Sequence, residues 1–152
     1  MPGGAGVIER ITHGGIELAI ILRAAPYADG IEFYTGADAS LQIGRMCRPE
    51  GYVIKPHVHL AAERSVSYTQ EALFIRSGRV EVNFYDATQS YLESRLLNTG
   101  DVILLMQGGH GFRVLEPSDI VEVKQGPYVG EHDKRRFTGV EEARGAHGEM
   151  KK

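Results

Sequence analysis

Short apolar runs separated by glycine-containing turns fill most of the chain after residue 15. In the segment 79–85, apolar side chains alternate with polar ones, which is typical of a strand with one buried face. The run VILLM at 102–106 is apolar throughout, as expected for a strand that is covered on both faces. No helix of normal length fits this pattern before residue 137. The chain is therefore expected to fold mainly as β-strands.

The predicted strands are short and follow one another closely. They cover 16–23, 31–34, 40–47, 51–55, 57–60, 71–76, 79–86, 91–98, 101–105, 110–115 and 119–125. Hairpin turns are expected at Ser77-Gly78 and in the loop 87–90. Many short strands without intervening helices predict an all-β fold, either a small antiparallel barrel or a double-sheet jelly roll.

The length of 152 residues suits one domain with a core of its own. We expect a loose N-terminal segment at 1–15, a single domain at 16–128 and a charged C-terminal tail at 129–152. A short helix is predicted within that tail, at 137–144.

The composition of the chain argues against nucleic acids and membranes as partners. The net charge of −3 gives no reason to expect a nucleic acid as partner. Cys47 is the single cysteine, so the chain has no internal disulfide framework. No apolar run is long enough to span a membrane, and the N-terminus lacks the pattern of a signal peptide. A cytoplasmic protein with no membrane partner is expected.

Three histidines and one glutamate stand out as candidate metal ligands. His57 and His59 are separated by one residue, so on a strand their imidazoles would share a face. Glu71 opens the next apolar run, and His110 follows the glycines of GDVILLMQGGHGF. Three imidazole nitrogens and one carboxylate suit a divalent transition metal.

The stretch 51–78 resembles the first motif of the cupin superfamily, G-x5-H-x-H-x3,4-E-x6-G. Gly51, His57 and His59 match its beginning, and Glu71 and Gly78 match its end. The gap between His59 and Glu71 is longer than in the motif, which implies an inserted loop.

The second cupin motif, G-x5-P-x-G-x2-H-x3-N, is matched in part. Gly100 and Gly108 stand at its anchor positions, and His110 lies one residue before the position of its histidine. Met106 replaces its proline, and Val114 stands where it has asparagine. The resemblance implies a cupin-type double-stranded β-helix, a jelly-roll barrel in which His57, His59, Glu71 and His110 bind the metal.

Two glutamates compete for the acidic position. Glu63 has the spacing from His59 that the motif requires, whereas Glu71 has the spacing to Gly78. Glu71 begins a predicted strand that fixes its direction, and Glu63 lies in predicted loop. Glu71 is therefore favoured.

The resemblance implies a metal-dependent enzyme for a small, oxygen-rich substrate, anionic or sugar-derived. An oxygenase and an isomerase both fit, and the metal could be Fe, Mn, Ni, Co or Zn. A sensor that binds a small molecule without catalysis and a metal-free sugar epimerase are the alternatives. Positively charged residues expected near the barrel mouth favour an anion. They are Lys55, Arg64, Arg113, Lys124, Arg135 and Arg136. The inner wall is expected to contain Val53, Leu73, Ile75 and Phe112.

The apolar segment IELAIIL at 16–22 lies outside the motif region. It is more apolar than an exposed edge strand should be. Pairing of this segment across a two-fold axis would cover it, so a homodimer is predicted.

Overall fold

The computed structural model describes residues 7–146, which form two compact units. The first unit contains the chain up to Ala24 and from Thr69 onward, and the second contains Ala25–Tyr68.

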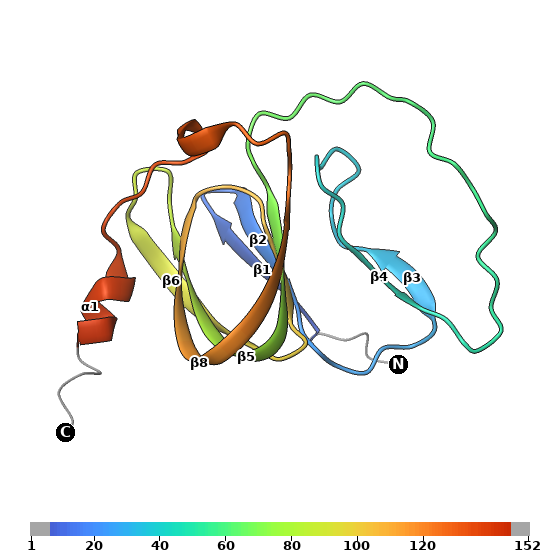
Figure 1. Ribbon diagram of the computed structural model, residues 1–152, viewed down its shortest axis with the longest axis horizontal. Helices are drawn as coiled ribbons and strands as arrows, with labels where there is room; N and C mark the ends of the chain where they lie inside the picture. The colour runs from blue at the N-terminus through green and yellow to red at the C-terminus, as the bar shows by residue number, and fades with distance from the viewer. Residues whose placement is uncertain (1–6, 147–152) are drawn as a thin grey trace. The chain divides into compact units, whose positions relative to one another are not determined.

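The first unit is a curled antiparallel sheet that resembles half of a barrel (Figure 1). Its strands run in the order β1-β2-β7-β5-β6, and β8 pairs with β5. The bounds are β1 Ile8–His13, β2 Ile16–Leu22, β5 Glu71–Tyr85, β6 Tyr91–Asn98, β7 Val102–Leu105 and β8 Gly109–Lys124. The prediction of an all-β fold is thus confirmed at this coarse level.

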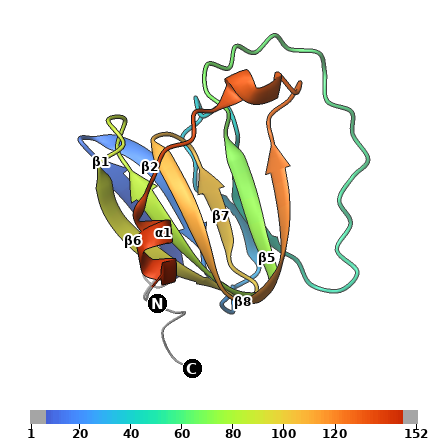
Figure 2. The same ribbon diagram turned by 60° about the vertical axis from the view of Figure 1, so that its left-hand side comes forward.

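The two longest strands, β5 and β8, pair along their whole length and bend together (Figure 2). Their ladder runs from Glu71 opposite Lys124 to Tyr85 opposite Gly109, with register shifts between Ile75 and Val80. Before the bend β5 also pairs with β7, and after it β5 pairs with β6. Each long strand therefore contributes one arm to each half of the curled sheet.

The predicted hairpin at Ser77-Gly78 is wrong, because β5 continues through this point as one strand. The reason is that β8 follows β5 around the bend and keeps it in the ladder. Gly78 has a φ of 91°, and a Cβ on it would lie 2.2 Å from Ser118 Oγ. A glycine is needed here for both its positive φ and its lack of a side chain.

The hydrophobic core fills the concave side of the curled sheet. Val80, Val82 and Phe84 are at most 1% exposed, which confirms the apolar face predicted for 79–85. The rest of the core comes mainly from β2, β7 and the first arm of β5. It contains Ile11, Leu18, Ala19, Ile21, Leu73, Ile75, Leu97, Ile103 and Leu105.

The N-terminal apolar strand β2 is paired on both edges and buried within its own chain. β2 pairs with β1 on one edge and with β7 on the other, and Leu18–Leu22 are buried. β1 was not among the predicted strands. Since β2 has no free edge, it cannot supply the dimer contact for which it was singled out. The homodimer itself stays a prediction.

The second unit contains one small hairpin and a long irregular segment. β3 Gly30–Phe33 pairs with β4 Gly44–Cys47. Residues 52–67 have no regular secondary structure, and all of them are exposed. The predicted strands at 51–55 and 57–60 are therefore wrong. A strand needs a partner for its backbone hydrogen bonds, and none of the ladders in the described chain includes this segment.

The C-terminal segment carries a short 3-10 helix at Gly130–Asp133 and the helix α1 at Val140–Ala146. The predicted helix at 137–144 is confirmed, with a start three residues later. α1 contacts β8 and lies on the outer side of the curled sheet in Figure 1.

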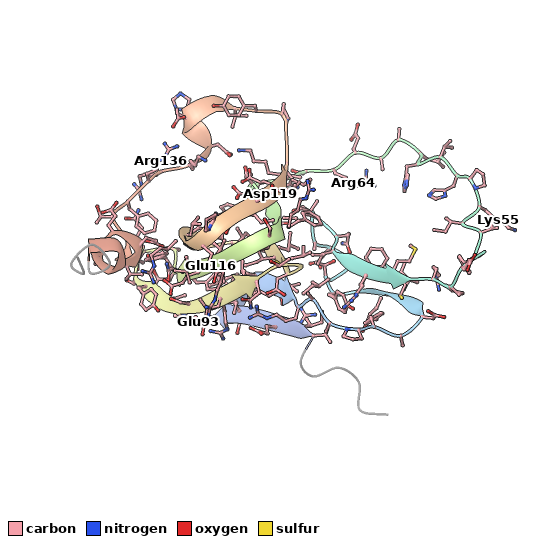
Figure 3. All side chains as sticks on the ribbon, turned by 60° about the horizontal axis from the view of Figure 1, so that its bottom comes forward. Lys55, Arg64, Glu93, Glu116, Asp119 and Arg136 are labelled. Atoms are coloured by element: carbon pink, nitrogen blue, oxygen red, sulfur yellow. The ribbon has the colours of Figure 1, made fainter. Side chains whose placement is uncertain are left out.

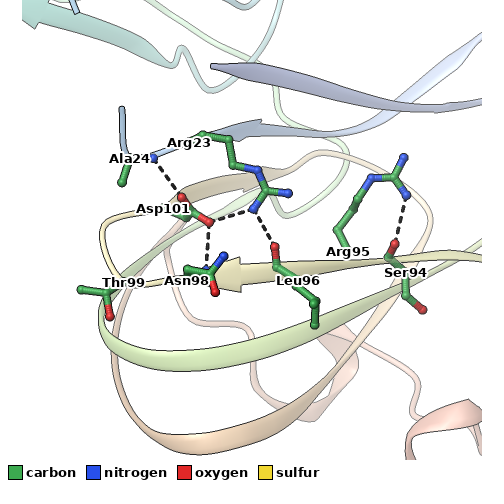
Figure 4. A pocket seen from close by; sticks show the side chains of 8 residues that line it. All are labelled: Arg23, Ala24, Ser94, Arg95, Leu96, Asn98, Thr99 and Asp101. Atoms are coloured by element: carbon green, nitrogen blue, oxygen red, sulfur yellow. Dashed lines mark hydrogen bonds and ion pairs between the residues drawn. The ribbon is translucent and has the colours of Figure 1, made fainter. Parts of the chain in front are cut away.

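Asp101 holds the turn between β6 and β7 in place (Figure 4). Its side chain is 4% exposed and accepts hydrogen bonds from the backbone N–H groups of Ala24 and Asn98, both at 2.9 Å. Arg23 Nη1 donates a third bond at 2.8 Å. Arg23 also donates to Glu9. Arg23 and Asp101 line the pocket drawn in Figure 4. Because their charges are paired within the protein, we assign both residues a structural role.

Candidate functional site

Glu71 and His110 meet on the concave side of the sheet. The Oε2 atom of Glu71 lies 3.6 Å from Nε2 of His110, and the two side chains are 17% and 29% exposed. Such partial exposure leaves both groups within reach of a small ligand. Both residues were predicted as site residues from the sequence, and the structure places them side by side.

The sheet register explains why both side chains point inward. Glu71 has the same parity as Leu73 and is paired with Leu105, and both leucines are core residues. His110 lies opposite Phe84, another core residue. Residues directly opposite each other in a ladder share a face. The expectation that the strand fixes the direction of Glu71 agrees with this register.

The surroundings of Glu71 favour its ionised form. The pKa of Glu71 lies below its ordinary value because the His110 imidazole donates toward the carboxylate and, when protonated, attracts it. Burial raises this pKa but is outweighed, and Lys124 and Lys134 add further attraction. The site therefore presents a carboxylate beside an imidazole that can carry a proton.

A pocket of about 500 Å³ opens beside this pair. It lies along β8 at His110–Phe112, and the C-terminal segment 134–142 forms its opposite wall. That segment contributes Lys134, Arg135 and Arg136 together with Phe137. The remaining lining comes from Glu71, Tyr85, Gly108, Gly111, Glu122, Glu141 and Glu142. The pocket thus combines the Glu71–His110 pair with three basic and three further acidic residues.

Glycines shape the β7–β8 connection next to His110. Gly108 has a φ of 75°, and a Cβ there would lie 2.7 Å from the carbonyl oxygen of Tyr85. Gly109 and Gly111 instead leave space for neighbouring side chains: a Cβ on Gly111 would lie 2.0 Å from Glu141 Oε1. Two of these glycines therefore make room for the C-terminal segment, a role that the sequence analysis did not assign.

Glu141 was missed as a residue of this site. Its carboxylate accepts hydrogen bonds from Asn83 Nδ2 at 3.0 Å and from the Tyr85 hydroxyl at 2.7 Å. Asn83 is fully buried on β5. Asn83 occupies a polar position of the alternating segment 79–85, and once buried its amide needs a polar partner. The sequence did not show which residue supplies that partner.

His57 and His59 belong to the second unit. Both are exposed, and their ring centroids lie 5.3 Å apart in an edge-to-face arrangement. His57 Nδ1 lies 2.9 Å from the carbonyl oxygen of Lys55. The strand geometry that was to align these rings is absent, because the segment is irregular. Glu63, the alternative acidic ligand, is an exposed residue of the same segment.

Two of the predicted metal ligands, His57 and His59, belong to the second unit, and the other two, Glu71 and His110, belong to the first. Glu71 and His110 have suitable donor atoms, but they are only two. Among residues 7–146, no group of three or more His, Cys, Asp or Glu side chains is arranged to hold a metal ion. The site with His57, His59, Glu71 and His110 stays a prediction.

The other residues expected near the site lie in several places. Arg113 pairs with Glu81 at 3.6 Å, and Arg136 pairs with Glu131 at 2.8 Å. Lys124 lies 3.9 Å from Glu122. Figure 3 labels Lys55 and Arg64 on the irregular segment of the second unit. Of the expected cations, the wall of the pocket described here contains Arg135 and Arg136.

The expected inner wall is present in part. Leu73 and Ile75 are core residues, and Phe112 packs against them. Val53 is 75% exposed in the second unit. It is exposed because the strand predicted for its segment does not form.

No family model matches the chain, and neither a curated protein nor a solved structure matches it. Within the described residues, no helix is long and apolar enough to cross a membrane. The case for a function therefore depends on the geometry of the site.

Proposed function

We propose that this protein binds a small, oxygen-rich anion in the pocket beside Glu71 and His110 and acts on it as an enzyme. The observation that carries the proposal is the close approach of these two side chains on the wall of a pocket. A carboxylate and an imidazole at this separation are a usual source of acid–base chemistry in proteins.

The roles of the two residues follow from their surroundings. His110 Nε2 faces Glu71 at 3.6 Å, so the carboxylate orients the imidazole ring. A protonated His110 can give its proton to a substrate oxygen, and a neutral one can accept a proton from a substrate carbon or hydroxyl. This chemistry suits an isomerase or epimerase. Glu71 acts on the substrate through its effect on His110.

Three basic residues on the pocket wall support the choice of an anion. Lys134, Arg135 and Arg136 line the pocket from one short stretch of chain. Carboxylates and phosphates are the groups that lysine and arginine bind most readily. Phe112 and Phe137 add apolar surface, which limits the size of the ligand and excludes water near the reacting atoms.

The cupin-type jelly roll remains part of this proposal. It is supported by the curled antiparallel sheet and by the meeting of Glu71 with His110, the motif residues of the first unit. A divalent metal at such a site would polarise a substrate oxygen. Glu71 and His110 alone are too few to hold one, so the chemistry proposed here does not use a metal.

A ligand and turnover screen tests the proposal. The protein is incubated with sugar phosphates, nucleotide sugars, keto acids and diketones, with and without added Mn, Fe, Ni, Co or Zn. We expect turnover that falls at least a hundredfold in His110→Ala and strongly in Glu71→Gln. His13→Ala and Glu116→Gln are the matched controls, since both residues are exposed and outside the pocket lining.

The outcomes distinguish an enzyme that uses this pocket from a non-catalytic sensor and from an enzyme that acts at another site. Stabilisation by a ligand without any product would favour the non-catalytic sensor. Turnover that survives both His110→Ala and Glu71→Gln would place the reaction elsewhere and overturn the proposal.

A further inference from the structure

One carboxylate makes two of the hydrogen bonds that attach the C-terminal segment to the outer face of the sheet. Glu141, the second residue of α1, accepts hydrogen bonds from Asn83 and Tyr85, which both lie on the second arm of β5. Residues 134–137, just before this attachment, form a wall of the Glu71–His110 pocket. The attachment therefore holds the C-terminal end of that wall, while Thr69 holds its other end through a hydrogen bond to Asp133.

The sheet is shaped to admit this carboxylate. Gly111 lies opposite Asn83 in the ladder, and any side chain at this position would occupy the space of Glu141 Oε1. A Cβ on Gly139 would lie 2.3 Å from the other carboxylate oxygen. Gly111, Gly139, Asn83 and Tyr85 surround a notch that the Glu141 carboxylate fills. We call it the Asn83–Tyr85 notch. Without this carboxylate, the amide of Asn83 would lose the partner that Glu141 supplies, which costs stability in a buried position.

Tyr85 connects the notch with the pocket. Its hydroxyl donates to Glu141 at 2.7 Å and accepts from the backbone N–H of Val140 at 2.9 Å. Its ring packs edge-to-face against Phe137, with centroids 5.0 Å apart. Tyr85 and Phe137 both line the pocket. A change at the notch is thus transmitted to the pocket wall through one side chain.

We propose that the Asn83–Tyr85 notch is a carboxylate-binding site whose occupant is Glu141, and that this contact is a latch. While the latch is closed, the segment 134–137 covers one side of the pocket and limits access to His110. When Glu141 leaves the notch, this wall moves away and His110 becomes exposed. The inference deepens the proposed function, because the latch controls entry to the proposed site. It can be tested without any substrate.

The experiment measures how fast His110 reacts with diethyl pyrocarbonate, with the modified peptides identified by mass spectrometry. In Glu141→Ala we expect at least a fivefold faster modification of His110 than in the wild type. Tyr85→Phe removes both hydroxyl bonds but keeps the ring, so we expect a smaller increase. Glu116→Gln is the charge-matched control and should leave the rate unchanged. His13 has a 52% exposed side chain and serves as the internal reference.

A second measurement follows the wall itself. Trypsin should cleave after Lys134, Arg135 or Arg136 faster in Glu141→Ala than in the wild type, because cleavage needs a locally released chain. If the Glu141→Ala variant does not keep the folded sheet, the rate at which its His13 is modified will change as well. In that case the rate of His110 modification in Tyr85→Phe tests the latch instead. Unchanged His110 modification in the folded Glu141→Ala variant, or in Tyr85→Phe where that decides, overturns the latch. A missing substrate would weaken only the proposed function.

Discussion

Glu71 and His110 lie 3.6 Å apart although they occupy opposite ends of the β5–β8 ladder. Glu71 is opposite Lys124 at one end, and His110 is opposite Phe84 near the other. They meet because both strands bend together between Ile75 and Val80, which brings the two arms face to face. The bend is thus a requirement of the site.

This requirement predicts a large effect of Gly78→Ala. The change places a methyl group 2.2 Å from Ser118 Oγ and 2.4 Å from the carbonyl oxygen of Pro117, at a φ of 91°. We expect a loss of about 2–4 kcal/mol in the free energy of unfolding, measured by urea denaturation. Gly14→Ala is the control, because Gly14 also has a positive φ but its Cβ would meet open space. Backbone strain alone should cost about 1–2 kcal/mol there. Equal losses in the two variants would contradict the crowding at the bend.

The predicted metal site is tested by elemental analysis of protein purified without chelator. If His57, His59, Glu71 and His110 bind one ion, the protein should contain close to one equivalent of transition metal. Glu71→Gln should weaken metal retention at least tenfold, a typical lower limit for loss of a group that supports a metal. Glu63→Gln is the matched control and should leave retention nearly unchanged. Protein that takes up no Mn, Fe, Ni, Co or Zn on reconstitution would refute the site.

Asp101 should be among the most sensitive positions of the first unit. Asp101→Asn removes a 4% exposed carboxylate from Arg23 and weakens two bonds to backbone N–H groups. We expect a loss of about 3 kcal/mol in the free energy of unfolding, because the Arg23 guanidinium loses the buried one of its two carboxylate partners. Asp119→Asn is the comparison: Asp119 pairs with Arg76 at 3.6 Å, and both side chains are more than half exposed. That change should cost less than about 0.5 kcal/mol. Similar losses would show that the β6–β7 turn does not depend on Asp101.

Glu9 should contribute to stability in a pH-dependent manner. Its pKa lies below 4.5 in the folded protein because Arg23 donates a hydrogen bond to it, and Arg23 and Arg95 attract it against the opposing effect of burial. The unfolded chain therefore binds more protons near this pH, and the contribution of Glu9 is present above about pH 4.5. It is lost as the pH falls through the folded pKa. The difference in unfolding free energy between wild type and Glu9→Gln should thus shrink from pH 7 toward about pH 3. A constant difference would contradict this linkage.

The sequence predicted much of the strand content because hydrophobic periodicity is a local property. The alternation at 79–85 and the apolar run at 102–105 correspond to β5 and β7. The prediction from the sequence failed at Ser77-Gly78, where a serine-glycine pair looks like a hairpin turn. The difference lies in β8, which pairs across the bend from about forty residues away in the chain. No local pattern contains that information.

The candidate site was predictable to the extent that its residues lie on regular strands. Glu71 was found because motif spacing and strand direction both pointed to it, and His110 because it follows the glycines of the second motif. The direction assigned to His57 and His59 assumed a strand that does not form. Glu141 was missed because its role depends on a tertiary contact with Asn83 and on the absence of a side chain at Gly111. Spacing along the chain does not show such contacts.

The shared strands have a mechanical consequence for the first unit. β5 and β8 each run through both halves of the curled sheet, so the two halves have no boundary at which they could separate. Opening either half requires breaking a ladder that continues into the other. We therefore expect the backbone amides of Leu73 and Val82 to become accessible to solvent exchange in a single cooperative event. The bend that brings Glu71 to His110 thus also joins the two arms into one folding unit.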